Sequence, residues 1–166
     1  MSNGDFEIRA GHGGDAGALV ELMRALHLHL KEPAQHISAE KLGRDVLCEG
    51  SAFDVLVAER AGKLMGYALF HETYESIYAH RGVYLADLFV VEEARREGLG
   101  RALVAGVAHG ARARDLKFLW WVSEAWDEDA QGFYAALGAS FDPMIAHSLS
   151  FEGFEALADE GNPDKG

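Results

Sequence analysis

The chain has 166 residues, 49% of them hydrophobic and 25% charged, a composition that suits one globular domain spanning residues 1–166. Its formal net charge of −12 disfavours a nucleic-acid partner, because phosphates require a basic surface. No apolar run approaches the ~18–20 residues of a membrane span, and the N-terminus lacks signal-peptide features. Cys48 is the single cysteine, so no internal disulfide is possible. We therefore expect a cytoplasmic protein that has no membrane partner.

The first half of the chain predicts two helices set between strands. Apolar residues recur at helical spacing after Asp15, a plausible helix cap, and Pro33 ends that helix. Arg60–Lys63 has the composition of a hairpin turn. The predicted elements are a strand at Phe6–Ala10, helices at Ala16–Lys31 and from Ser38 to Gly50, and strands at Asp54–Glu59 and Leu64–Tyr74.

The second half alternates strands and helices. The predicted elements are a strand from Tyr84 to Val91, a helix from Gly98 to about Arg114, a strand at Phe118–Val122, a helix at Glu128–Leu137 capped by Asp127, and a strand at Phe141–Phe151 broken by Pro143, with a short acidic tail after it. A hairpin implies antiparallel strands, whereas a β-α-β crossover implies a parallel pair. The order therefore predicts a mixed α/β (α+β) sheet with helices on its faces.

A glycine-rich turn between a strand and a helix is the strongest functional signal. Arg95–Arg101 reads R-x-x-G-x-G, and the backbone N–H groups at such a turn lie at the positive end of a helix dipole, which favours phosphate. It is neither a Walker A loop nor a dinucleotide fingerprint. Gly11–Ala16 does fit the dinucleotide pattern, but two helices follow it where the fingerprint needs a second parallel strand. Gly11–Ala16 is therefore interpreted as a loop with a helix cap, and an ordinary tight turn is the alternative for Arg95–Arg101.

Three stretches together with this turn resemble the GNAT family of acetyl-coenzyme A-dependent N-acetyltransferases, and within it the polyamine N-acetyltransferase branch. The stretches are Gly66–Phe70 with Thr73-Tyr74, Tyr84–Val90, and Trp126–Glu128 followed by Gly132–Ala139. The resemblance covers nearly the whole chain. It implies a GNAT-like fold, with a mostly antiparallel central sheet, helices on both faces, and a splayed parallel strand pair that binds the coenzyme.

The resemblance also implies which residues hold acetyl-CoA. The pantetheine arm would pair with backbone near Phe89–Val91, and the pyrophosphate would lie on the N–H groups of the glycine turn. Asp127 stands where the family has asparagine near the coenzyme. The implied coenzyme-binding residues are Phe89, Val90, Val91, Arg95, Arg96, Gly98, Leu99, Gly100, Arg101, Asp127 and Tyr134.

For chemistry, the resemblance implies direct attack of a small primary amine on the thioester, with a polyamine or diamine as first choice and an amino acid or lysine analogue as second. Tyr134 matches the family's general acid, although a core tyrosine beside Phe133 is the alternative. The general base is open: the branch carries glutamate where this chain has Ala86, and either the following Asp87 or a water chain would have to serve. The candidate acceptor-binding residues are Glu72, Tyr74, Glu75, Asp87 and Glu124.

The remaining residues carry weaker signals. None of the eight histidines shows a metal-ligand spacing, so no metal is expected, and His27 and His29 point to different faces of one helix. Family likeness implies a homodimer, with the C-terminal strand a candidate for exchange. The rival interpretation is a coenzyme-binding sensor or interaction module that has lost catalysis, and Ala86 is the feature that favours it.

Overall fold

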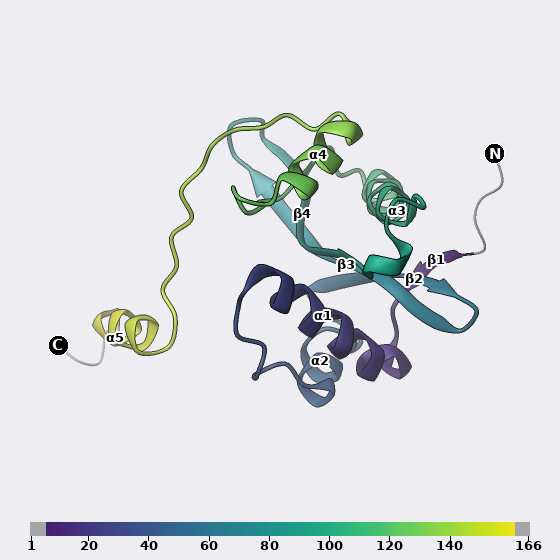
Figure 1. Ribbon diagram of the computed structural model, residues 1–166. Coiled ribbons are helices and arrows are strands. Elements are labelled where there is room, and N and C mark those ends of the chain that lie inside the picture. The colour runs from purple at the N-terminus through teal and green to yellow at the C-terminus, as the bar shows by residue number, and fades with distance from the viewer. Residues whose placement is uncertain (1–5, 162–166) are drawn as a thin grey trace. The chain divides into compact units, whose positions relative to one another are not determined.

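The computed structural model describes residues 6–161 (Figure 1). They divide into two compact units, one ending at Gln131 and the other beginning at Gly132. The first unit contains β1 (Glu7–Ala10), α1 (Ala16–Leu30), α2 (Ala39–Asp45), β2 (Phe53–Arg60), β3 (Lys63–Glu75), β4 (His80–Val90), α3 (Leu99–Ala113) and β5 (Leu119–Trp120). Helix α4 (Glu128–Leu137) spans the boundary, and α5 (Glu152–Glu160) belongs to the second unit.

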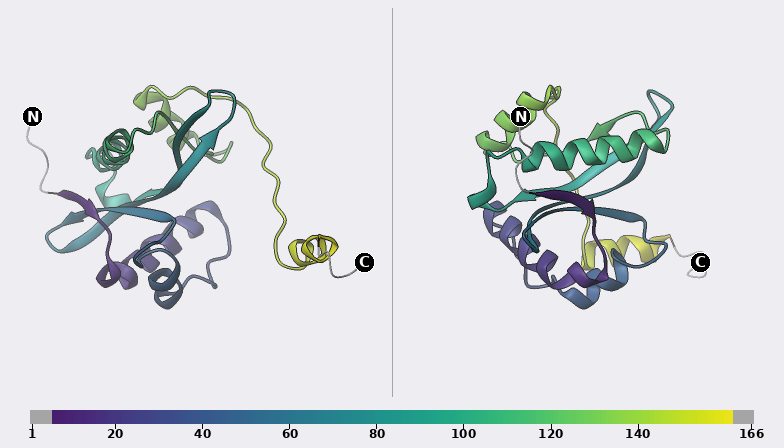
Figure 2. Two further views of the ribbon diagram at one scale, coloured as in Figure 1. Left: turned by 180° about the vertical axis from the view of Figure 1, so that it is seen from behind. Right: turned by 90° about the vertical axis from the view of Figure 1, so that its right-hand side faces the viewer.

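Within residues 6–161, five strands form one sheet in the order β1-β2-β3-β4-β5. The first four pair antiparallel, and β5 pairs parallel with β4. Helices α1 and α2 cover one face of the sheet and α3 covers the other, as the views in Figures 1 and 2 show. The predicted mixed, mostly antiparallel sheet with helices on both faces is confirmed.

Each face of the sheet has its own hydrophobic core. On one side α3 packs Leu103 and Val107 against strand residues such as Ala68. On the other side α1 packs Leu19 against Val57 and Tyr67, all of them fully buried. We name these the α3 face and the α1 face. The alternation of strand side chains assigns each sheet residue to one of them.

Local sequence explains where several elements begin and end. The Ser38 hydroxyl accepts a hydrogen bond from the Lys41 N–H at 3.3 Å and starts α2, as its sequence predicts. Ala61 and Gly62 both have positive φ, 48° and 78°, the geometry that a tight two-residue hairpin requires between β2 and β3. The prediction of that hairpin is confirmed.

Strand β4 contains a β-bulge at Ala86. Leu69 of β3 pairs with Asp87 and the next residue, Phe70, pairs with Leu85, so Ala86 is an extra residue with no partner in that ladder. The bulge resets the alternation of β4. Leu85 and Leu88 therefore both contact the α3-face core, while Asp87 and Phe89 turn to the α1 face.

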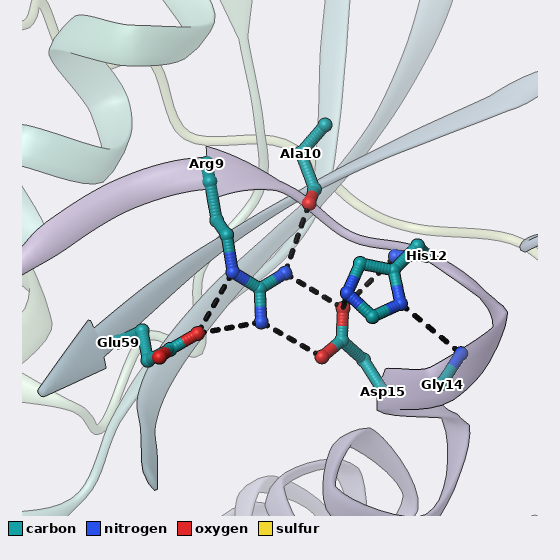
Figure 3. A network of polar contacts seen from close by, with 6 residues as sticks. All are labelled: Arg9, Ala10, His12, Gly14, Asp15 and Glu59. Atoms are coloured by element: carbon teal, nitrogen blue, oxygen red, sulfur yellow. Dashed lines mark hydrogen bonds and ion pairs between the residues drawn. The ribbon is translucent and has the colours of Figure 1, made fainter. Parts of the chain in front are cut away.

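A network of charged groups ties β1 to β2 and to the start of α1 (Figure 3). The Arg9 guanidinium donates two hydrogen bonds of 2.8 Å to the two Asp15 carboxylate oxygens and a third of 2.8 Å to Glu59. Asp15 also accepts from the His12 backbone N–H at 2.9 Å, and its side chain is buried. Asp15 thus occupies the residue before α1 but makes no side-chain cap hydrogen bond to that helix, which differs from the predicted cap.

The C-terminal prediction of a strand at Phe141–Phe151 is wrong for the described chain. Residues 139–150 form neither helix nor strand, and a helix, α5, occupies Glu152–Glu160 where an acidic tail is expected. A strand is stable only in a ladder with a neighbour, and Pro143 cannot donate to one. The predicted strand at Phe118–Val122 is shorter than expected, Leu119–Trp120.

We expect Arg9→Met to lower the free energy of unfolding by about 2–3 kcal/mol, because it leaves the buried Asp15 carboxylate without its cation. Hydrogen bonds from Arg9 hold the pKa of Asp15 below its ordinary value. The unfolded chain therefore binds the proton first, and this stabilisation is present above pH ~4 and lost as pH falls through the lowered pKa. Urea unfolding at pH 7 and at stepwise lower pH should show less acid sensitivity from this site in the variant.

Arg44→Met is the matched control, because Arg44 pairs with its neighbour Asp45 on the exposed surface of α2. Exposed pairs contribute little, so its unfolding curve should stay close to that of the parent protein. An equal loss of unfolding free energy in the two variants would contradict a specific stabilising role of the Arg9 network.

Candidate active site

The glycine turn forms an anion-binding nest at the N-terminus of α3. Arg96 and Gly98 adopt left-handed φ values of 64° and 92°, and alternation of this kind points successive N–H groups to one side. The N-cap residue of α3 is Gly98, which has no side chain to cap the helix, so the first N–H groups of α3, those of Leu99 and Gly100, are suited to an anionic ligand. A Cβ built on Gly98 would meet no atom within 4 Å, so the turn faces open space.

Side chains from the flanking elements hold this turn in place. Arg60, at the end of β2, forms an ion pair with Glu97 inside the motif. The Arg95 Nε donates a 3.0 Å hydrogen bond to the Val90 carbonyl, and its guanidinium lies 5.8 Å from the centre of the Phe89 ring. Arg95 therefore folds back onto the end of β4, next to the backbone predicted to pair with pantetheine.

Strands β4 and β5 share only a short stretch of parallel pairing in the described chain. Val83 pairs with Leu119 and Tyr84 pairs with Trp120, after which β5 ends while β4 continues to Val90. Gly82 permits this pairing, because a Cβ there would lie 2.5 Å from the Phe118 ring. The C-terminal part of β4, which includes Phe89, is thus left without a strand partner on the β5 side.

Asp87 lies on the α1 face beside this unpaired edge. Its carboxylate accepts a 2.9 Å hydrogen bond from the hydroxyl of the fully buried Tyr67. Burial raises the pKa of the Asp87 carboxyl above its ordinary value, and the Tyr67 hydrogen bond opposes this only in part. Burial and the negative charge of Asp87 likewise raise the pKa of Tyr67. A partly buried carboxyl of raised pKa is suited to proton transfer.

The end of α1 and the residues just after it contribute a second pair of titratable groups near Asp87. The His27 Nδ1 lies 2.9 Å from a Glu32 carboxylate oxygen. Both side chains are close enough to shift the pKa of Asp87, His27 downward and Glu32 upward. The sequence gives His27 no special signal, because its neighbours on the helix share no ligand spacing with it.

The other predicted acceptor residues are not all brought to Asp87. Glu72 and Tyr74 alternate with Phe70 of the α3-face core, and Glu72 accepts a hydrogen bond from Arg81 at 3.3 Å. Glu75 ends β3 and accepts from the Ile77 N–H at 3.3 Å. Glu124 lies in the segment between β5 and α4, where its backbone carbonyl accepts from the Asp127 N–H.

Asp127 connects α1 to the start of α4. One carboxylate oxygen accepts from the Ala130 N–H at 3.0 Å, which confirms the predicted helix cap, and the other lies 2.8 Å from His29 Nε2. Burial raises the pKa of Asp127, but the His29 and Ala130 hydrogen bonds and the charge of Arg95 outweigh it and lower the pKa overall. The charge of Arg95, another predicted coenzyme residue, thus reaches the Asp127 carboxylate.

Tyr134 lies on α4 in the second unit, where its ring centre is 5.3 Å from that of Phe133. Among residues 6–161 no group of three or more His, Cys, Asp or Glu side chains is arranged to hold a metal ion. None of the helices in that range combines the length and apolar character needed to cross a bilayer.

Comparison with known proteins agrees with these features. The model of the Acetyltransferase (GNAT) family matches residues 20–139. The chain is 32% identical to the thialysine N-epsilon-acetyltransferase of Bos taurus, an alignment that covers 88% of this chain and 92% of the relative. It is 35% identical to the L-ornithine N5-acetyltransferase of Arabidopsis thaliana over 52% of this chain and 35% of that protein.

The fold is shared with solved structures. An integron cassette protein from the mobile metagenome of V. cholerae superposes with a TM-score of 0.76 at 24% identity, over 93% of this chain and 98% of that one. The family model covers well over half of the chain, and its span includes the strand edge at Asp87 and the glycine turn. The chain therefore belongs to the GNAT family of acetyltransferases and is an acetyl-CoA-dependent N-acetyltransferase.

Proposed function

We propose that this enzyme acetylates the primary amine of a small molecule. The glycine turn carries the proposal, because it joins an open, uncapped helix N-terminus to the unpaired edge of β4. Polyamines or diamines are the acceptors that the resemblance favours. The names of the relatives, which mention thialysine and ornithine, favour amino acids with an amine at the end of the side chain. All of these acceptors share a terminal primary amine.

The residues at this edge fit acetyl-CoA, which supplies the acetyl group as an activated thioester. Backbone groups of Phe89–Val91 would hold the pantetheine arm, and the turn from Arg96 to Arg101 would hold the pyrophosphate. Arg95 would have to release the Val90 carbonyl for that backbone to pair, after which its positive charge is available to phosphate. Asp127, within electrostatic range of Arg95, would fix the position of that guanidinium.

Asp87 is proposed to receive the proton of the incoming ammonium, directly or through water. The neutral amine nitrogen then forms a bond to the acetyl carbon as the carbon–sulfur bond breaks. Tyr134, the general acid that the resemblance implies, would give its proton to the leaving sulfur, and the second proton that the nitrogen loses as the amide forms would return to Tyr134 through solvent. Tyr67 holds the Asp87 carboxylate by one oxygen and leaves the other to accept a proton. The bulge at Ala86 is what turns Asp87 to this face, so an acid is supplied although the branch's glutamate is missing.

A second candidate is a coenzyme-binding sensor or interaction module without catalysis. The observation that favours it is Ala86, an exposed alanine at the bulge where the branch carries glutamate.

The homodimer with C-terminal exchange and the cytoplasmic location both stay predictions. The homodimer is supported by the large apolar side chains that the second unit exposes, such as Phe141 and Ile145.

Coenzyme binding and turnover should separate in two variants. Gly98→Val places a β-branched residue at φ 92°, which costs about 1–2 kcal/mol, and should lower acetyl-CoA affinity at least tenfold. Tyr134→Phe should keep that affinity and lower kcat. Calorimetric titration with acetyl-CoA and a thiol-release assay with diamines and lysine analogues measure the two quantities. Full affinity in Gly98→Val would reject the site, and an unchanged kcat in Tyr134→Phe would reject the acid role. Coenzyme binding with no transfer to any amine would favour the sensor.

The pH profile tests Asp87. Because burial raises its pKa above the ordinary ~4, kcat/KM should fall as pH drops through that raised value, where the carboxyl becomes protonated and can no longer accept. Asp87→Asn should remove this acidic limb and lower kcat/KM by about 10²–10⁴. Asp54→Asn is the control, since Asp54 pairs with Arg114 away from the site, and it should keep the limb. An acidic limb that survives in Asp87→Asn would assign the base elsewhere.

A further inference from the structure

Four rings from four adjacent strands form a continuous row on the sheet. Phe53 pairs in register with His71, His71 with Tyr84, and Tyr84 with Trp120. The centres of successive rings are 5.4, 5.4 and 4.7 Å apart. We name these four residues the aromatic row. Phe53 and Trp120 are 37% and 39% exposed, so the row is partly open to solvent.

The aromatic row shares a face with Asp87. Phe53 alternates with Val55 and Val57, and His71 alternates with Leu69 and Tyr67, all of which contact the α1-face core. Leu69 pairs with Asp87, and His71, two residues further along β3, pairs with Tyr84. Two residues of a strand span roughly 6.5–7 Å, so the row begins about that far from the Asp87 position along the sheet.

The row also lies where an acceptor must approach, a step that rests on the proposed function. Tyr84 and Trp120 are the last parallel pair before β5 ends. The coenzyme turn follows the C-terminal end of β4, so its reactive end has to extend back along the unpaired edge toward Asp87. The acceptor must then approach Asp87 from the opposite side, where the aromatic row lies.

The composition of the row selects among amines. Its residues offer no lysine or arginine for an acceptor's carboxylate and no acid for a second ammonium. Arg81 and Arg114 pair instead with Glu72, which alternates with Phe70 of the α3-face core and therefore lies on the other face of the sheet. Rings attract other rings by edge-to-face and offset packing, beyond simple burial. We propose that the aromatic row binds the ring of an arylalkylamine whose amino group reaches Asp87, which makes such amines a further acceptor class.

Binding without coenzyme tests this directly. Titration of 2-phenylethylamine should quench the tryptophan fluorescence saturably, because Trp120 belongs to the row. The matched ligand 2-cyclohexylethylamine has the same amine and a similar size but no π system, and it should bind about fivefold to tenfold more weakly. Equal affinity for the two amines would overturn the proposal.

Variants then test the row in turnover. Tyr84→Leu should raise KM for 2-phenylethylamine about tenfold, with KM for an aliphatic diamine and for acetyl-CoA changed less than about threefold. Trp120→Leu is the second variant, with thermal unfolding as the check on folding. Tyr78→Leu is the matched control, because Tyr78 is an exposed ring outside the row. It should leave the KM for both acceptors unchanged.

The remaining outcomes are also decisive. If Tyr84→Leu raises both acceptors' KM equally and changes the association state in sedimentation, the row is a contact between protomers and the proposal is wrong. If acetyl-CoA fails to bind, the proposed function fails, while the fluorescence titration still judges the row. Acetylation of diamines without discrimination between the phenyl and cyclohexyl amines would keep the proposed function and reject the row alone.

Discussion

The extra residue at Ala86 is the constraint on which the site depends. Without it, β4 would alternate strictly, and Asp87 would share the α3 face with Leu85, in a core that offers a carboxylate no hydrogen bond. With the bulge, Asp87 accepts a hydrogen bond from the Tyr67 hydroxyl, and Leu88 instead of Asp87 packs against the α3-face core. A bulge also increases local twist. The same residue therefore sets which face carries the acid and helps β4 diverge from β5 beyond Tyr84.

Close backbone approach supports this divergence from both sides. A Cβ on Gly66 would lie 2.6 Å from the Phe89 carbonyl oxygen, and one on Gly82 would enter the Phe118 ring. Larger residues at either place would push β4 away from β3 or β5. Two glycines thus fix β4 between its neighbours at its ends, while the bulge adjusts the middle. The anion nest at Gly98 then continues from a strand whose path is already determined.

Sequence predicts this architecture where the signals are local. Ser38 precedes an amphipathic run, and Ala61-Gly62 separates two strands, so cap and hairpin are both confirmed. The prediction of a strand at Phe141–Phe151 is wrong, because strand pairing depends on a neighbouring strand that composition cannot reveal. The bulge is invisible for a related reason: Ala86 is an ordinary strand residue until the register with β3 is known. Tyr67 has a usable signal, since it alternates with Leu69 on a buried strand.

The histidines show most clearly what local patterns miss. His27 and His29 do point in different directions from α1, and the structure gives each a separate acidic partner, Glu32 and Asp127. Asp127 is 98 residues from His29, a separation over which no spacing rule operates. Its two oxygens serve two elements: one caps α4 and the other holds α1. An asparagine would offer a single acceptor oxygen for these tasks. Aspartate at this position therefore joins the end of α1 to the first turn of α4, a connection that neither helix's own sequence pattern reveals.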